Sequence, residues 1–308
     1  MPRRAVRYTA GAVAVVIACI VVVQLVPSGA ILHSHRPSHS HLGQRLAVPA
    51  YIDPTTDPGA WAALSGARPG SVGIVVANVA NGPGSQPVPA WTSAMQQMHD
   101  AGSSVLGYVD TGYLGSPAGG RRKGLPTRTG STGVRAWLAQ VDADIDAWYE
   151  FYGSAIGGIF LDQSTSDCGP TATSVEYADL YRTLSAYVKQ AHPGALTALN
   201  PGTAVAQCYR DSADVLVTFE GSYQDYTGAD ASPNQTYHPL TWSPANPDEI
   251  WHIVYGAMST GELQHAVTLS KSRDAGYVYV TSAVPPNPFD SLPLGPYWTV
   301  EQSASSAR

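Results

Sequence analysis

The 308-residue sequence lacks the short motifs that mark several common kinds of functional site. It has no glycine-rich nucleotide fingerprint, no Gly-x-Ser-x-Gly elbow for a serine nucleophile, and no spacing of His and Cys typical of a metal site. The segment Asn-Gly-Pro-Gly at residues 81–84 follows a predicted strand, but its proline is unsuited to a phosphate cradle. We therefore expect no cofactor and no structural metal ion.

Charge is also scarce, since charged residues make up 13% of the chain and the formal net charge is −6. Three of the 17 basic residues and none of the 23 acidic ones lie in residues 1–30, which leaves 14 basic and 23 acidic residues and a net charge of −9. Nucleic-acid binding relies on Lys and Arg opposite phosphates, so this acidic body without a basic stretch argues against it. Such a body would instead attract a cationic partner.

Cysteine is scarce as well, with three residues in the chain. Cys19 lies in the apolar N-terminal segment, so Cys168 and Cys208 are the two in the body, each just past a predicted strand. In an oxidising compartment an even count favours a disulfide, and two unpaired thiols are the alternative. A bridge that closes a loop of about 40 residues would contribute roughly 4 kcal/mol in the chain-entropy model.

The first 30 residues are typical of an export signal. Three arginines precede an apolar run over residues 10–26, and the small residues 28–30 resemble a cleavage site. An uncleaved membrane anchor is the alternative, because the run is only slightly short for a membrane span. In both cases we expect the body to be secreted or anchored outside the cytoplasmic membrane.

Residues 31–45 alternate histidines with Ser, Arg and Pro. A stretch of this kind could bind a metal ion loosely. It has too few apolar residues to fold alone, so we expect a solvated linker before the folded domain. The folded domain is expected over residues 46–300, with a short tail at residues 301–308.

Eight short apolar stretches in the body predict strands. An unbroken apolar run of this length is typical of a strand buried on both faces. The predicted strands span residues 46–52, 72–77, 104–109, 157–161, 196–199, 215–219, 251–255 and 276–280. Helical spacing of apolar residues lies between most of them, at residues 91–101, 132–152, 175–191 and 260–275, and is weak after the first, fifth and sixth strands.

Eight strands with helical crossovers over about 255 residues predict a single-domain α/β fold, a (β/α)8 TIM-type barrel. A doubly wound open sheet is the alternative. That fold normally carries a glycine-rich phosphate loop after its first strand, where this chain has Asp-Pro-Thr-Thr at residues 53–56.

Polar side chains at the strand ends are the candidate functional residues, because active sites of such barrels are built where the carboxyl ends of the strands converge. The strand ends carry Asp53, Asn78, Asp110, Asp162, Gln163, Asn200 and Glu220. For any one of these residues, capping of the next turn is the alternative. For the set, the alternative is a polar layer that merely closes the barrel.

Two carboxylates in a pocket with amides and aromatic residues are suited to glycosidic bond cleavage. One carboxyl group protonates the leaving oxygen, and the other stabilises or attacks the developing cation. Asp162 and Glu220 follow the most apolar strands, so they should be the most desolvated and are the expected catalytic pair. Their carboxyl groups should then lie about 5 to 10 Å apart. A stacking floor for sugar rings is expected from Tyr51, Tyr108, Tyr113, Tyr223 and Tyr255.

An ordered set of short segments resembles the spherulin-4-like family. The matching segments are Val-Pro-Ala-Tyr at 48–51, Asn-Gly-Pro-Gly at 81–84, Gly-Tyr-Val-Asp-Thr-Gly-Tyr at 107–113, Gly-Ile-Phe-Leu-Asp at 158–162, Asn-Pro-Gly-Thr at 200–203 and Phe-Glu at 219–220. They span nearly the whole body. The resemblance implies a (β/α)8 barrel and an activity like that of the family's glycoside hydrolases, which cleave internal α-1,4 linkages of N-acetylgalactosamine-containing polysaccharide.

The family's functional acids are an Asp-Glu pair after the fourth strand and a Glu after the sixth. The resemblance places them at Asp162, position 163 and Glu220. The chain departs at Gln163, because an amide cannot donate or accept a proton as a carboxyl group does.

This departure leaves three interpretations open. Asp162 and Glu220 suffice to hydrolyse an amino-sugar polymer, or the barrel hydrolyses a different glycan with Asp110 or Asp53 assisting, or the protein is a non-catalytic extracellular glycan-binding or coat protein. The expected partner is a polysaccharide, with no protein partner implied, and the acidic body suits a partly deacetylated, cationic amino-sugar polymer. The expected substrate-binding residues are Asp53, Asn78, Tyr108, Asp110, Gln163, Asn200, Tyr223 and Tyr255.

Overall fold

The computed structural model describes residues 43–116, 124–229 and 236–307. These residues belong to one compact unit, His41–Arg308. The expected export segment and most of the expected linker lie outside the described residues. Among the residues that are described, no helix has the length and apolar character needed to cross a membrane.

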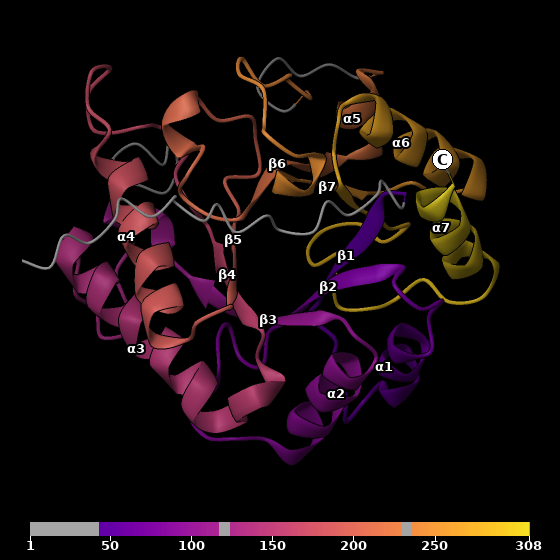
Figure 1. Ribbon diagram of the computed structural model, residues 1–308, viewed down its shortest axis with the longest axis horizontal. Helices are drawn as coiled ribbons and strands as arrows, with labels where there is room; N and C mark the ends of the chain where they lie inside the picture. The colour runs from indigo at the N-terminus through magenta and orange to yellow at the C-terminus, as the bar shows by residue number, and fades with distance from the viewer. Residues whose placement is uncertain (1–42, 117–123, 230–235, 308) are drawn as a thin grey trace, which may run out of the picture. The chain divides into compact units, whose positions relative to one another are not determined.

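Eight parallel strands form a closed barrel, in which each strand pairs with its neighbours in sequence and β1 pairs with β8 (Figure 1). The strands are β1 (Arg45–Ala50), β2 (Val72–Ala77), β3 (Ser104–Asp110), β4 (Gly158–Asp162), β5 (Leu196–Leu199), β6 (Val215–Ser222), β7 (Ile250–Tyr255) and β8 (Tyr277–Val280). The closed parallel barrel confirms the predicted (β/α)8 fold and rules out the open sheet.

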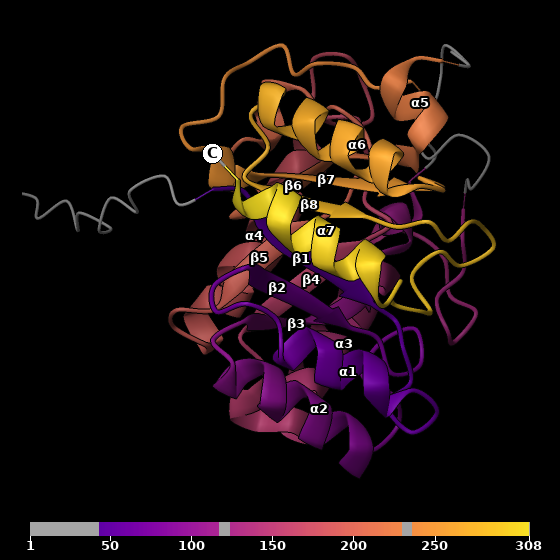
Figure 2. The same ribbon diagram turned by 90° about the vertical axis from the view of Figure 1, so that its right-hand side faces the viewer.

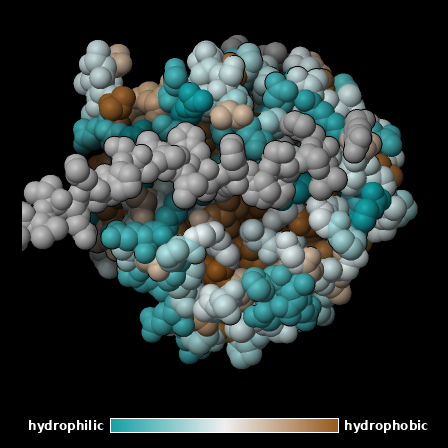
Figure 3. Space-filling view, viewed as in Figure 1, coloured by the Kyte–Doolittle hydropathy of each residue, from teal (hydrophilic) through white to brown (hydrophobic). Residues whose placement is uncertain are grey.

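The helices lie outside the strands, and α6 and α7 pack side by side there (Figure 2). The α-helices are α1 (Pro58–Ser65), α2 (Pro89–Asp100), α3 (Val134–Tyr152), α4 (Glu176–Ala191), α5 (Tyr223–Thr227), α6 (Thr260–Ser272) and α7 (Pro296–Ser306). Short 3-10 helices are η1 (Gly112–Gly115), η3 (Gly153–Ala155), η4 (Gln207–Tyr209) and η5 (Pro247–Glu249). On the face in Figure 3, hydrophobic side chains are visible toward the centre and hydrophilic ones predominate around the perimeter.

The connections with weak helical signals hold the shortest helices. The chain between β5 and β6 forms only η4, and the described residues between β6 and β7 form α5, of five residues, and η5. After β1, the eight-residue α1 begins at Pro58, with the Asp57 carboxylate accepting from the Ala60 N–H. Too few apolar residues lie in these short helices for a periodic pattern to show.

The folded domain extends beyond both expected limits. At its start, the buried Gln44 amide donates to Ser270 and to the Ala275 carbonyl oxygen. At its end, α7 continues past residue 300 to Ser306, and an oxygen of the buried Glu301 carboxyl group accepts from the Val280 N–H at 2.8 Å. Residues 301–306 are therefore part of the helix that packs outside β8 rather than a tail.

Close packing of α3 against β3 depends on a glycine. A Cβ atom at Gly107 would lie 2.5 Å from the Trp148 ring, so no larger residue fits there. The Trp148 indole N–H then donates to the carbonyl oxygen of Tyr108 at 2.7 Å. This bond fixes the part of β3 that carries Tyr108, a predicted site residue.

Candidate active site

The carboxyl ends of β4, β5 and β6 bring two carboxylates and one amide together. Asn200 Nδ2 donates to Asp162 Oδ1 at 2.7 Å and to Glu220 Oε2 at 2.6 Å. Both oxygens accept from the same nitrogen atom. The separation between the two oxygens therefore cannot exceed twice the longer of these distances. The two carboxyl groups therefore lie in one cluster and not on opposite sides of the barrel, as the two-carboxylate hypothesis requires.

Asp162 is stabilised as a carboxylate by several donors. Withdrawal from water raises its pKa above the ordinary value, while hydrogen bonds from the Tyr108 hydroxyl, the Gln163 backbone N–H and Asn200 oppose that rise. The nearby charge of Asp110 raises the pKa slightly further. These donors favour the ionised form of Asp162 over that of its neighbour.

Glu220 has a carboxyl group whose pKa lies near neutrality. Withdrawal from water and then the negative charge of Asp162 raise the pKa of Glu220 to about 7, against the opposing hydrogen bond from Asn200. A carboxyl group that is half protonated near neutral pH is suited to donate a proton to a leaving group. The two carboxyl groups of this cluster thus have different surroundings.

Gln163 supports Asp162 through a tyrosine. The Tyr108 hydroxyl donates to the Asp162 carboxylate and accepts from the side-chain amide of Gln163. Gln163 has a left-handed backbone, with φ of 52°, and its carbonyl oxygen accepts from the Tyr113 N–H and the Thr111 hydroxyl. Backbone strain of this kind is common at functional sites. The amide also removes one negative charge that a Glu would place in this cluster.

Two further tyrosines flank the carboxylates. The Tyr51 ring meets the Tyr108 ring edge to face, with centroids 5.4 Å apart. Burial and the charge of Asp162 raise the pKa of Tyr51. Tyr255 is half-buried, and the charge of Glu220 contributes to its raised pKa, after burial and the charge of Asp225. The Tyr51 and Tyr255 side chains are therefore within electrostatic range of the two acids, whereas the ring of Tyr108 is buried and is not placed to stack on a sugar.

Two predicted substrate-binding residues hold rim loops. Asn78 Oδ1 accepts from the Gly82 N–H at 3.0 Å. Asp110 Oδ1 accepts from the Gly112 N–H at 2.8 Å, and its Oδ2 accepts from Asn81 at 3.2 Å. Asp110 still acts on the site, because its charge influences the pKa of Asp162.

Two other predicted residues make their contacts away from the acids. Asp53 is exposed, and its Oδ1 accepts from the N–H and the hydroxyl of Thr55, as in a turn. Tyr223, at the start of α5, bonds through its hydroxyl to His265 Nδ1 of α6 at 2.8 Å. Asp53 takes the turn role because β1 ends at Ala50, so Asp53 lies three residues beyond the strand.

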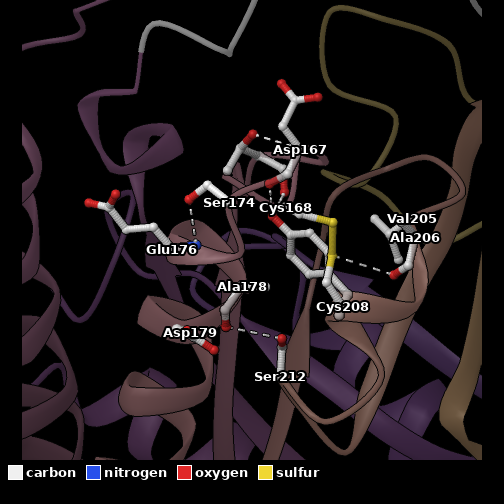
Figure 4. Close-up of a disulfide and its surroundings, with 12 residues drawn as sticks. Asp167, Cys168, Ser174, Glu176, Ala178, Asp179, Val205, Ala206, Cys208 and Ser212 are labelled. Atoms are coloured by element: carbon white, nitrogen blue, oxygen red, sulfur yellow. Dashed lines mark hydrogen bonds between the residues drawn. A yellow bond between two sulfur atoms is a disulfide. The ribbon is translucent and has the colours of Figure 1, made fainter. Parts of the chain in front are cut away.

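The disulfide between Cys168 and Cys208 confirms the predicted pairing (Figure 4). It joins the loop after β4 to the connection between β5 and β6. The Tyr209 hydroxyl, next to the bridge, donates to the carbonyl oxygens of Thr165 and Asp167. Covalent and hydrogen-bonded links therefore hold together the two segments that follow Asp162 and Asn200.

Strand β6 contains a β-bulge that was not predicted from the sequence. The register of β6 against β7 shifts between Val217 and Phe219. The available signals were Thr218 inside an apolar run and His252 inside another, both of which are buried. Among the described residues, no group of three or more His, Cys, Asp or Glu is placed to hold a metal ion.

A model of the family described as Spherulation-specific family 4 matches residues 45–304. The chain belongs to this family. Its resemblance to spherulin-4-like proteins is therefore confirmed over the whole barrel. Within spherulation-specific family 4, the chain is similar to Spherulin-4 of Physarum polycephalum, with 28% identity over 205 residues. That alignment covers 66% of this chain and 50% of Spherulin-4, so the chain spans half the length of this relative.

Two solved structures resemble this family member. Aspergillus clavatus Sph3, solved in complex with GalNAc, has a TM-score of 0.62 and 19% identity, covering 86% of this chain and 98% of Sph3. The glycoside hydrolase domain of PelA from Pseudomonas aeruginosa has a TM-score of 0.48 and 16% identity, covering 81% of this chain and 97% of that domain. The likeness to Sph3 shows a common fold.

Proposed function

We propose that the protein is an extracellular glycoside hydrolase that cleaves internal α-1,4 linkages of an (N-acetyl)galactosamine-containing polysaccharide. The observation that carries this proposal is the pair of carboxylates, Asp162 and Glu220, bound to one Asn200 nitrogen at the rim of the barrel. Membership of spherulation-specific family 4 supports the reaction class. Sph3 has the same fold, and its structure was solved in complex with GalNAc, which supports the proposed sugar.

In this proposal Glu220 is the acid and Asp162 the nucleophile or the stabilising anion. Glu220, with a pKa of about 7, protonates the glycosidic oxygen of the departing chain. Asp162, held ionised by three donors, attacks or stabilises the sugar cation that develops. The shared Asn200 donor keeps the two carboxyl groups close, which favours a retaining reaction over one that needs room for a water molecule between them.

The substrate in this proposal is a partly deacetylated, cationic form of the polymer. The net charge of −9 outside residues 1–30 would attract such a chain. The Tyr51 ring, which is half-buried and packs against the buried Tyr108 ring, offers apolar surface to a sugar ring. The Cys168–Cys208 disulfide supports an oxidising location outside the cytoplasm.

The test is product release. The full-length protein is incubated with a partly deacetylated α-1,4-galactosamine polymer, and oligosaccharides are detected by mass spectrometry. Asp162→Asn and Glu220→Gln should each reduce release by about 1,000-fold or more. The matched control is Asp290→Asn, which removes an exposed carboxylate from the loop after β8 and should leave release unchanged.

Release that survives both substitutions would refute this assignment of the acids. Binding of the polymer by the parent protein without release would refute hydrolysis. That second result would identify a non-catalytic glycan-binding protein, for which the replacement of the family's Glu by Gln163 would be the physical reason.

A further inference from the structure

Strand β6 contains one residue more than its partner at the point of the bulge. Val217 pairs with Trp251, and Phe219 pairs with the next residue of β7, His252. Thr218 is therefore the extra residue of a β-bulge. Bulges of this kind re-aim the side chains that follow them.

The bulge decides which way Glu220 points. The Trp251 ring meets Phe160 of β4, with centroids 5.5 Å apart, so Trp251 faces the barrel interior. Ile253, two residues on, shares that face, and it pairs with Glu220. In a strand without the extra residue, alternation from Val217 would turn Glu220 outward and away from Asp162.

Phe219, the residue before Glu220, points out of the barrel, as expected if the bulge has changed the alternation of side chains along β6. Its ring lies 4.7 Å from that of Tyr226 in α5 and 6.0 Å from that of Tyr237, both outside the barrel. Beyond the bulge, the Glu220 N–H donates to the carbonyl oxygen of Gly202 at 3.0 Å. The strand thus swings toward the loop after β5, where Asn200 lies.

One imidazole holds the bulge in place. His252 Nε2 lies 3.1 Å from the Thr218 hydroxyl, and His252 Nδ1 lies 2.8 Å from the Tyr226 hydroxyl. His252 is 1% exposed, and burial followed by the charge of Arg273 lowers its pKa to about 3. The ring is therefore neutral, and both of its nitrogens are used in hydrogen bonds.

Tyr226, the hydrogen-bond partner of His252, is itself held by Arg273. The Arg273 guanidinium lies over the Tyr226 ring at 4.2 Å and over the Tyr237 ring at 3.8 Å. Arg273 Nη1 also donates to the carbonyl oxygen of Tyr226 at 2.9 Å. Tyr226 is therefore held in position to orient His252.

We infer that Thr218, His252 and Tyr226 are positioning residues, which hold the bulge that turns the Glu220 carboxyl group toward Asp162. None of the three needs to contact substrate. The inference rests on the proposed function for the catalytic role of Glu220, but the placement of Glu220 can be measured without any substrate.

The pKa of the Glu220 carboxyl group is the readout, because it reports the surroundings of that group. The groups that act on this carboxyl are Asp162 from β4, Asn200 after β5, Tyr51 after β1 and Tyr255 at the end of β7. A general loss of stability lowers the folded fraction but leaves the pKa of the folded protein unchanged. A Glu220 that turns away from Asp162 loses the charge of Asp162 as a cause of its raised pKa.

The experiment is a carboxyl titration by NMR of full-length protein labelled with ¹³C at the glutamate carboxyl carbons. The Glu220 signal is assigned from its loss in Glu220→Gln. Thr218→Val, which keeps the branched shape and removes the hydroxyl, should lower the pKa of Glu220 by about one unit or more. Thr218→Ser, which restores the hydroxyl, should return it to within about half a unit of the parent value.

The matched control is Thr197→Val. Thr197 is a buried threonine of β5 whose hydroxyl contacts Asp214 instead of the bulge, so its loss should leave the Glu220 signal unchanged. Tyr226→Phe provides a second route if Thr218→Val does not fold, because it removes the bond to His252 and keeps the ring under Arg273. It should lower the pKa of Glu220 in the same direction.

An unchanged pKa of Glu220 in both Thr218→Val and Tyr226→Phe would overturn the inference. The same proteins are assayed for oligosaccharide release, where Thr218→Val should lose about tenfold or more of the rate. A shifted pKa with no release by the parent would support the positioning role and refute the proposed function. Release by the parent with an unshifted pKa of Glu220 in the variants would support the proposed function and refute the positioning role.

Discussion

The carboxylates of Asp162 and Glu220 accept hydrogen bonds from the same nitrogen atom, Nδ2 of Asn200. One amide cannot neutralise two negative charges at this distance, so the second ionisation of the pair is disfavoured. The pair therefore holds one proton near neutral pH, which is the state that an acid and an anion in one site require.

Replacing Asn200 should disable the pair. Asn200→Asp exchanges the shared donor for a third carboxylate, which converts two hydrogen bonds into repulsions. Because a hydrogen bond to a charged group contributes about 1.5–3 kcal/mol, we expect kcat to fall by about 100-fold or more. The control is Asn287→Asp, the same substitution in an exposed turn. There the new aspartate keeps the side-chain oxygen that accepts from the Phe289 N–H. Equal rates for parent and Asn200→Asp would show that the shared donor is dispensable.

The pH dependence of the rate should follow the two carboxyl groups. Glu220 must be protonated to act as the acid, so kcat/KM should fall as the pH rises through about 7. Asp162 must be ionised, and its raised pKa should place the loss of activity on the acidic side above the range of an ordinary aspartate. A rate measured from pH 4 to pH 9 checks both limbs, and a rate that stays level from pH 6 to pH 9 would exclude Glu220 as the acid.

Restoring the family's acid at position 163 should impair the site on its acidic side. Gln163→Glu removes the amide donor to Tyr108 and adds a like charge beside Asp162, which should raise the pKa of Asp162. We expect the acidic limb of the pH–rate profile to move up by about one unit, with no gain in kcat at pH 7. Gln264→Glu, which makes the same change on the exposed face of α6, is the control. A tenfold rise in kcat for Gln163→Glu would show instead that this position has an acid or base role.

The buried Glu301 should make stability fall with rising pH. Burial raises its pKa from 4.5 to about 8, so the folded protein binds a proton that the unfolded chain releases between those values. Stability from this group is therefore fully present below about pH 4.5 and is lost as the pH rises toward about 8.

Glu301→Gln mimics the protonated acid and keeps the oxygen that accepts from the Val280 N–H. In urea unfolding we expect the variant to match the parent at pH 5 and to exceed it by roughly 2 kcal/mol or more at pH 9. The exposed Glu176→Gln of α4 should show no such pH-dependent difference. A difference from the parent that is the same at both pH values would contradict the expected ionisation.

Loss of the disulfide should destabilise the rim loops. The bridge spans a sequence separation of 40 residues, which corresponds to about 4 kcal/mol in the chain-entropy model. Cys168→Ala combined with Cys208→Ala should lower the free energy of unfolding by roughly that amount. Reductant should shift the urea midpoint of the parent and leave that of the double variant unchanged; an unshifted parent midpoint would refute a stabilising bridge.

Much of the fold could be predicted from local pattern. The run that ends at Asp162 is apolar on both faces, which is the mark of a strand in a parallel barrel, and the eight such runs match the eight observed strands. The weak helical signals after the fifth and sixth strands correspond to η4 and α5, which are short. Burial can be predicted well from sequence pattern, because a buried side chain must be apolar or have a hydrogen-bond or ion-pair partner.

The candidate site was predictable as a set of strand ends, but the use of each side chain was not. Asp53 and Asn200 both follow a strand, yet the first accepts from Thr55 in a turn and the second bridges two carboxylates. Each residue type can make either contact, so only the neighbours brought from other strands decide between them.

The sequence by itself determined that the chain closes eight strands into a barrel and delivers Asp162 and Glu220 to one rim. Tertiary structure decided that Glu220 faces inward, since this depends on the extra residue Thr218 and on His252 from β7. A side chain's direction alternates with every residue, so a single bulge reverses it, and the hydrogen bonds that hold a bulge come from distant parts of the chain.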